Sequence, residues 1–138
     1  MEQIPVRSTK KANLLEFLEL RDFAVENLGD GIYKVTRDEE LPVFLRIGDG
    51  NIFFEVDLGN IDAIASQELY FKLLDLNTEI LPVSLGIDNS NLDDPRLVLV
   101  ERRETGDLCD EELLCVFDSL ELAVDRTAEV LQGAAIAT

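Results

Sequence analysis

The sequence predicts one α+β domain in which a five-stranded, mainly antiparallel sheet carries helices packed on it as a second layer. Strand-like patterns occur as a group of three and a group of two, and helical patterns precede, separate and follow these groups. A chain of 138 residues is about one domain long and can bury enough apolar surface to fold without disulfides or metal ions. We therefore expect a single domain over residues 1–138, with loose tails at 1–9 and 133–138, in the order α-β-β-β-α-β-β-α.

An amphipathic pattern predicts a first helix from about Lys10. Its apolar side consists of Leu14, Leu15, Phe17, Leu18 and Leu20. The helix either stops near Asp22 or continues to Leu28, where Gly29 follows as a typical C-terminal cap. Residues 23–28 also alternate well enough to form a short strand, so the sequence leaves both alternatives open.

Three strands are predicted next, over residues 31–36, 41–47 and 52–58. β-Branched and aromatic residues are frequent in all three, which is typical of strands. The segment 48–51, Gly-Asp-Gly-Asn, supplies residues that tolerate positive φ angles and therefore predicts a tight hairpin turn. Residues 31–58 are thus expected to form a continuous antiparallel meander.

Two further helices are indicated by capping residues and apolar periodicity. The second helix is expected to follow Asn60, a good N-cap, and to end at residues 76–77. Its main apolar stripe consists of Ile61, Ala65, Leu69, Leu73 and Leu76. The last helix is expected from Asp107, as its N-cap, to about Gln132, with Gly133 just beyond its end.

Two more strands are predicted at 81–87 and 96–101, joined by the acidic loop 88–95. The density of oxygen ligands in this loop invites comparison with a calcium site. The spacing fails, because Leu92 stands at the fifth position and Leu99 at the twelfth, where an EF-hand loop needs oxygen ligands. The loop is therefore expected to be a polar connection, and we expect no metal-binding residues.

The net charge of −17, from 12 basic and 29 acidic residues, limits the partners of the protein. Nucleic acids and anionic membranes are excluded as default partners, because this chain would repel phosphate groups. The charge lies in residues 38–138, since residues 1–37 carry six acids and six bases. Neither a secretory signal nor a membrane-spanning segment is evident, so a cytoplasmic location is expected.

Catalytic and cofactor sites are not indicated by the composition. The chain contains no histidine, which excludes catalysis and metal binding that depend on that residue. Cys109 and Cys115 lie six positions apart in a helical pattern, about 120° from sharing a face, and are expected to be reduced thiols. No sequence rule selects a catalytic pair among the many carboxylates, so we expect a protein that is not an enzyme and binds no cofactor.

Excess apolar surface on the second helix is the most informative candidate site. Tyr70, Phe71 and Leu74 project about 100–200° away from the Leu69 stripe, although a helix on a sheet needs only one apolar face. They are either buried in the core of the domain or form an interface with a second subunit or client. We predict the interface, with a homodimer and a basic or amphipathic protein partner.

Several short segments carry a family resemblance. They are Arg37–Phe44 (RDEELPVF), Leu73-Leu74 with Asn77, Ile80–Ser84 (ILPVS) and the helical residues Glu112, Leu120, Leu122 and Ala123. On these segments the chain resembles the YjfI-like family of uncharacterised bacterial proteins, within the type III secretion chaperone-like superfamily. One departure is the fully charged segment 101–104, where family members tend to have a small, glycine-containing segment.

The resemblance implies a cytoplasmic, dimeric, non-enzymatic module that binds protein and is associated with PspA-like envelope-stress proteins. We therefore predict an acidic chaperone-like or regulatory accessory protein. The alternatives are an immunity-type protein that neutralises a basic toxin and a small hydrolase that uses carboxylates alone. A pocket with two or more buried carboxylates of perturbed pKa would favour the hydrolase.

Overall fold

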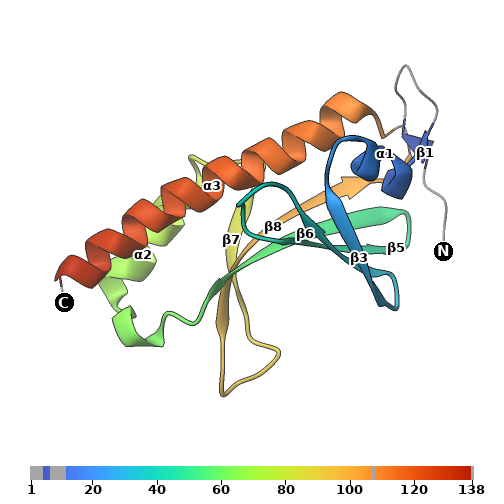
Figure 1. Cartoon of the computed structure of the whole chain (residues 1–138). Helices are drawn as coiled ribbons and strands as arrows, with labels where there is room; N and C mark the ends of the chain where they lie inside the picture. Colours follow the sequence, from blue (N-terminus) through green and yellow to red (C-terminus); the bar gives the residue numbers. More distant parts are fainter. Residues whose placement is uncertain (1–4, 7–11, 107, 138) are drawn as a thin grey trace. The chain divides into compact units, whose positions relative to one another are not determined.

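The computed structural model of the chain describes residues 5–6, 12–106 and 108–137 (Figure 1). In chain order, its elements are β1 (Pro5–Val6), β2 (Ala12–Asn13), α1 (Leu14–Leu20), β3 (Ala24–Gly29), β4 (Ile32–Thr36), β5 (Val43–Gly48), β6 (Asn51–Gly59), the 3₁₀ turn η1 (Asp62–Ile64), α2 (Gln67–Asn77), β7 (Ser84–Asp88), β8 (Arg96–Glu104) and α3 (Asp110–Ala137). The predicted α+β class with an antiparallel sheet is confirmed.

The main sheet has six strands, in the order β3-β4-β5-β6-β8-β7, so the prediction of five strands is wrong. The additional strand is β3, which occupies the segment that the sequence left open between helix and strand. Asp22, with a φ of 67°, turns the chain after α1, and Ala24 then pairs with Thr36 of β4. The order around the main sheet is therefore α-β-β-β-β-α-β-β-α, and β1 and β2 form a separate two-stranded pair.

The predicted meander over residues 31–58 is confirmed. Strand β4 pairs antiparallel with β5, and β5 pairs antiparallel with β6. The turn between β5 and β6 contains Asp49 and Gly50, with φ angles of 52° and 75°. This left-handed conformation is the one that the Gly-Asp-Gly-Asn segment predicts for a tight hairpin.

The chain divides into two compact units, each made of two stretches of sequence. The first unit comprises residues 1–56 and 101–117, and the second comprises residues 57–100 and 118–138. Strands β6 and β8 and helix α3 each contribute residues to both units. The two units are described separately below.

Aromatic side chains form the centre of the first unit. The Phe117 ring lies 4.6 Å from Phe23 and 5.9 Å from Phe54, in tilted and edge-on arrangements that aromatic pairs prefer. Helix α1 begins after Asn13, whose side chain accepts a hydrogen bond from the Glu16 N–H group at 3.0 Å. The helix ends near Asp22, as one alternative predicted. It starts later than predicted, because Ala12–Asn13 form β2, and Lys10 itself lies outside the described residues.

The second unit is built on a cluster of buried apolar residues: Ile61, Leu69, Leu73 and Leu97. Helix α2 begins at Gln67 and not after Asn60, so that prediction is wrong. Asn60 instead precedes the short turn η1, whose N-cap position is Ile61, and the Asn60 Oδ1 accepts a hydrogen bond from the Asp62 N–H group at 2.8 Å. The N-cap of α2 is Ser66, whose hydroxyl accepts from Leu69 N–H at 3.0 Å.

The last elements of the chain agree with the prediction in type but differ in length. Strand β7 starts three residues later and ends one residue later than predicted, whereas β8 starts at the predicted residue and ends three residues later. Helix α3 runs to Ala137 and not to Gln132, so Gly133 lies inside the helix. A helical glycine costs about 1 kcal/mol relative to alanine, but here alanines follow it and Ala134 packs against the apolar cluster. The predicted N-cap, Asp107, lies outside the described residues.

Candidate protein-binding surface

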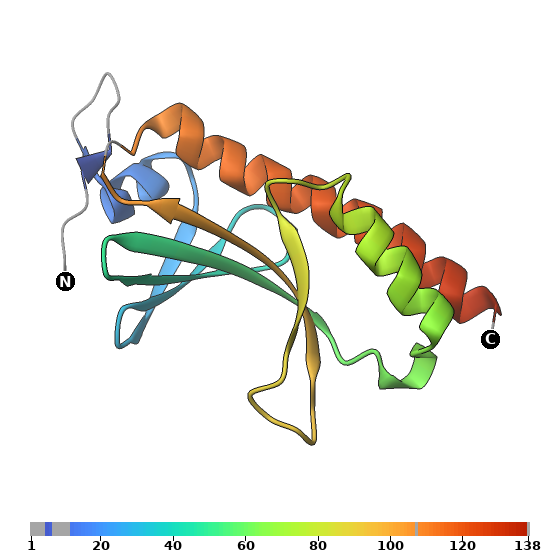
Figure 2. The same cartoon turned by 180° about the vertical axis from the view of Figure 1, so that it is seen from behind.

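Helix α2 is held in the second unit by one buried face and by a hydrogen bond at its C-terminal end. Leu69, Leu73 and Leu76 are buried on this face. At the end of the helix, Asn77 Oδ1 accepts a hydrogen bond of 2.7 Å from the Leu85 N–H group of β7. Figure 2 shows α2 alongside the C-terminal part of α3, where Val130, Leu131 and Ala134 contact the buried cluster.

The opposite face of α2 carries three large exposed side chains, which we call the α2 apolar surface. Tyr70 is 44% exposed, Leu74 is 69% exposed and Phe71 is 72% exposed. Residues spaced three and four apart are neighbours on a helix, so Leu74 lies beside both aromatic side chains. The alternative in which these residues fill the core of their own domain is therefore wrong, because the core side of α2 is the face with Leu69.

Charged groups border the α2 apolar surface. Lys72 Nζ lies 3.2 Å from Glu68 Oε1 on the adjacent side of the helix, in an i,i+4 pair. Both side chains are more than half exposed, so this pair adds little stability. An exposed apolar centre with a charged border is typical of a surface that contacts another protein.

A buried carboxylate in the first unit was not predicted from the sequence. The side chain of Glu101 on β8 is 2% exposed, and its Oε2 lies 2.8 Å from Arg103 Nη2. Its Oε1 has no hydrogen-bond partner among the described residues. Burial raises the pKa of Glu101, Arg103 opposes this, and the nearby Glu112 carboxylate adds to the increase. The strand alternation of Leu97, Leu99 and Glu101 is the sequence signal that places this acid on the inner face.

The acidic loop uses its carboxylates in local hydrogen bonds. Asp88 Oδ1 accepts from the backbone and side chain of Ser90, which lowers the pKa of Asp88. Asp94 accepts from Asn60 at 2.8 Å, and this bond, together with Arg96, lowers the pKa of Asp94. In the part of the chain that the structure describes, no group of three His, Cys, Asp or Glu side chains is placed to hold a metal ion.

Two further candidate features show no catalytic arrangement. A hollow of about 180 Å³ is lined by Ala24, Val25, Glu26, Lys34 and Thr36. Glu26 is the only carboxylate that lines this hollow, and it is exposed. The hollow therefore does not contain the two buried carboxylates that would favour a hydrolase. Cys109 is half-buried, Cys115 is exposed, and both thiols are free.

Solved structures of type III secretion proteins share the fold of this chain. A chain of the heterodimeric ExoU–SpcU complex of the type III secretion system of Pseudomonas aeruginosa is similar with a TM-score of 0.70 and 20% identity, over 87% of this chain and 98% of that chain. The Yersinia pestis chaperone SycH, in complex with a stable fragment of YscM2, is similar with a TM-score of 0.57 and 22% identity, over 85% and 95%. The CesT_Tir_1 family model matches residues 8–136, and the chain belongs to this family.

A structure outside the secretion chaperones shares the same fold. YbjN, a putative transcription regulator from E. coli, is similar with a TM-score of 0.63 and 15% identity, over 90% of each chain. No curated protein matches the sequence. Among the described residues, the helices are too short or too polar to cross a membrane.

Proposed function

We propose that the protein is a chaperone-like, non-enzymatic module that binds another protein, and that it works as a homodimer in the cytoplasm. Membership of the CesT_Tir_1 family supports a protein-binding role. The single observation that carries the dimer is the α2 apolar surface, where Tyr70, Phe71 and Leu74 remain exposed in one copy of the chain. A second copy that covers this surface would remove three large apolar side chains from water.

The proposed client is a basic or amphipathic protein segment. ExoU–SpcU is a heterodimeric complex, and the SycH structure contains a fragment of YscM2, so both relatives are found with another protein. The net charge of −17 would attract a basic segment, and apolar contact would then retain it. A Lys-rich amphipathic peptide should accordingly bind, and binding should weaken as salt increases.

The resemblance to the YjfI-like family extends this proposal to an accessory role beside a PspA-like envelope-stress system. The two alternatives, an immunity-type protein and a carboxylate-dependent hydrolase, receive no support from a specific feature of the described residues. Glu101 is the buried acid with a raised pKa, and its ion-pair partner is Arg103 and not a second carboxylic acid. The hydrolase would be favoured only if hydrolytic activity were measured and lost on Glu101→Gln.

The energy available to the dimer can be judged from exposure. Fully burying a large apolar side chain contributes about 1.5–3 kcal/mol. Since 44–72% of each of the three side chains is exposed, covering all of them supplies about 4 kcal/mol per subunit before the entropy of association. Two copies with a charge of −17 repel each other, so the dimer should become tighter as salt screens this repulsion.

Light scattering on matched aspartate variants tests the dimer. Leu74→Asp should place an unpaired charge at the interface and shift the protein toward the monomer without unfolding it. Leu92→Asp is the control, because Leu92 is 78% exposed in the β7–β8 loop and its replacement adds the same charge. The homodimer is wrong if the wild-type protein stays monomeric at high salt and high concentration, or if both variants dimerise equally well.

A further inference from the structure

The second face of the first unit's sheet carries aromatic and basic side chains. On β4, β5 and β6, Tyr33, Val35, Leu45 and Phe54 are buried on the inner side, and Phe54 contacts Phe117 of α3. Residues that alternate with them point to the opposite side, which we call the open sheet face. This face includes Ile32, Lys34, Phe44, Arg46 and Phe53.

A row of three side chains crosses the centre of the open sheet face. Arg46 is the cross-strand partner of Phe53, and its guanidinium lies 4.8 Å from the centre of the Phe53 ring. The Thr105 N–H group donates to the Gly50 carbonyl at 2.9 Å. An antiparallel register continued from this bond places Arg102 opposite Phe53, on the other side from Arg46. We call Arg46, Phe53 and Arg102 the Arg-Phe-Arg row.

The cations on this face lack carboxylate partners. Among the described residues, neither Lys34, Arg46 nor Arg102 has an acidic group within ion-pair distance, although the chain has 29 acids. Other basic residues among those described do have such a partner, for example Arg21, Lys72, Arg96, Arg103 and Arg126. Basic groups that remain unpaired in so acidic a chain are available to an external carboxylate.

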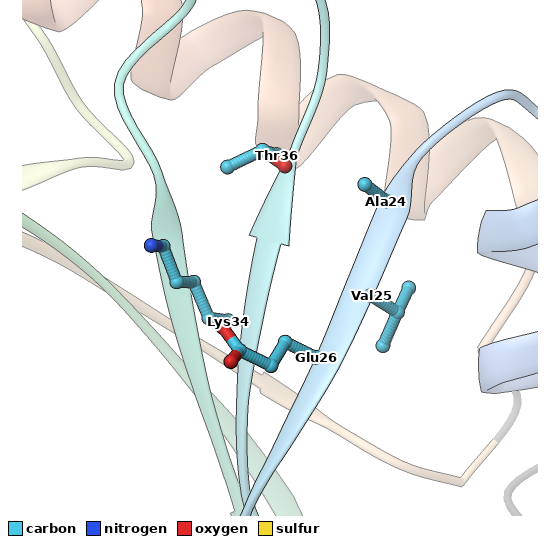
Figure 3. A pocket seen from close by; sticks show the side chains of 5 residues that line it. All are labelled: Ala24, Val25, Glu26, Lys34 and Thr36. Carbon is cyan, nitrogen blue, oxygen red and sulfur yellow. The ribbon is translucent and has the colours of Figure 1, made fainter.

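Several acids lie on the open sheet face beside the row, and one of them is next to Phe53. Glu55 follows Phe53 by two positions along β6 and is the cross-strand partner of Phe44. Glu26 is the cross-strand partner of Lys34 on the side of β3, and Figure 3 shows both side chains on the same side of the strands, with Val25 pointing away. This pair borders the 180 Å³ hollow described above. Glu104 follows Arg102 by two positions along β8. The row itself is therefore an aromatic ring flanked by two guanidinium groups, and Glu55 and Glu104 lie next to it.

We propose that the Arg-Phe-Arg row binds an acidic amphipathic segment of a partner protein, with one carboxylate on each arginine and an apolar side chain on Phe53. A guanidinium binds a carboxylate through two parallel hydrogen bonds, which makes such pairs strong and directional. Two strand spacings separate the arginines, or about 10 Å. Carboxylates seven residues apart on an α-helix are also separated by about 10 Å, and the residues between them present an apolar side chain to Phe53.

A nucleic acid is the less favoured occupant of the same row. An aromatic ring between arginines can stack on a base, but a polyphosphate brings many charges toward a chain with a net charge of −17. A peptide with two carboxylates meets much less of this repulsion, because the repulsion grows with the charge of the partner. The row is also distinct from the α2 apolar surface, so this inference does not depend on the proposed homodimer.

A designed peptide tests the inference at 0.15 M salt. The probe is a fluorescent, helical 18-residue peptide with Glu at positions i and i+7 and Leu at i+3 and i+4, and the control peptide has Gln for both Glu residues. Wild-type protein should bind the Glu peptide at least tenfold more tightly than the Gln peptide. The R46Q/R102Q variant should lose this difference, whereas the K72Q/R126Q variant, which changes the net charge equally, should keep it.

Three results would overturn the inference. Equal binding of the Glu peptide by R46Q/R102Q and wild-type protein would show that the row makes no contact. Tighter binding of an oligouridylate than of the peptide would assign the row to nucleic acid. A change in the mass of the free protein on R46Q/R102Q substitution would show that a second copy covers the row. The Leu74→Asp variant should bind the Glu peptide as tightly as the wild-type protein does, because Leu74 is not part of the row. This result would support the inference even if the homodimer proposal fails.

Discussion

Replacing Arg103 with methionine should destabilise the protein strongly at neutral pH, because it removes the ion-pair partner of a buried carboxylate. Glu101 is 2% exposed at its side chain, and Arg103 Nη2 lies 2.8 Å from its Oε2. The other oxygen, Oε1, has no partner among the described residues that could compensate for the loss. The variant would therefore leave a buried charge without its nearest cation.

The expected loss follows from this burial. Breaking a fully buried ion pair by removing one partner costs about 3–5 kcal/mol. The Arg103 side chain is 29% exposed, so water can reach part of the site, and we expect a loss of about 2–3 kcal/mol in the free energy of unfolding at pH 7. The control is Arg126→Met, which removes an exposed pair with Glu79 and should cost less than about 1 kcal/mol.

The loss should depend on pH with a defined sign. The pKa of Glu101 is raised in the folded protein, so its neutral form favours folding below the unfolded pKa, and that contribution is lost as pH rises through the folded pKa. Removing the Arg103 charge raises the pKa further. The deficit of Arg103→Met relative to wild type should therefore be smaller at pH 5 than at pH 7.

Urea unfolding of four proteins at both pH values measures these effects. The set is wild type, Arg103→Met, Glu101→Gln and the double variant. The double variant should recover at least about 1 kcal/mol relative to Arg103→Met at pH 7, because no buried charge remains. A deficit below about 0.5 kcal/mol for Arg103→Met, or a deficit that is equal at both pH values, would refute the reasoning and show that water solvates Glu101.

Three further predictions concern the second unit and metal binding. Ser66→Ala should lower the free energy of unfolding by about 1 kcal/mol, because the N-cap bond to Leu69 is lost, and Ser66→Asp should restore it. Asn77→Ala should cost about 1 kcal/mol in the same urea assay through the lost bond to the Leu85 N–H group, whereas no change would show that water replaces the amide. EDTA should leave the melting temperature unchanged in a thermal scan, and a shift of several degrees would reveal a structural ion.

The central strands could be predicted from sequence because their residues alternate and their turn is specific. Buried and exposed positions alternate along β6, and Asp49-Gly50 adopts the positive φ angles that a tight hairpin requires. Strand β3 could not be assigned in the same way. Of its residues only Val25 is half-buried and the rest are exposed, so its apolar pattern is too weak to distinguish a strand from a helix. The segment is a strand because it pairs with β4, and such pairing between separate segments cannot be recognised from the sequence of the segment itself.

Helix ends were predicted less well because several local signals compete. Asn60 and Ser66 are both residue types that favour an N-cap, but Asn60 precedes the short turn η1 and bonds to Asp62, whereas Ser66 caps α2. Gly133 has the character of a C-terminal cap, yet the alanines after it continue α3. In both cases packing against the apolar cluster decides the outcome, and this packing is not visible in the local sequence.

The two candidate surfaces differ in how far the sequence could indicate them. The α2 apolar surface follows from helical periodicity alone, since Leu69 and Leu74 fall on opposite sides of any regular helix. The Arg-Phe-Arg row unites residues from β5, β6 and β8, and only the strand register brings them together. The buried Glu101 was likewise treated as part of a charged segment, because its environment depends on which face of β8 packs inward.

The division of the chain into two units has a consequence for synthesis on the ribosome. The chain passes between the units after residues 56, 100 and 117, and each passage lies within a hydrogen-bonded element: β6, β8 and α3. The first hundred residues to emerge therefore contain Phe23 and Phe54 without Phe117, the ring that contacts both. The first core cannot close until the start of α3 has left the exit tunnel, and the second core is covered only when Val130, Leu131 and Ala134 follow. A chain that stalls before α3 therefore exposes two incomplete apolar cores.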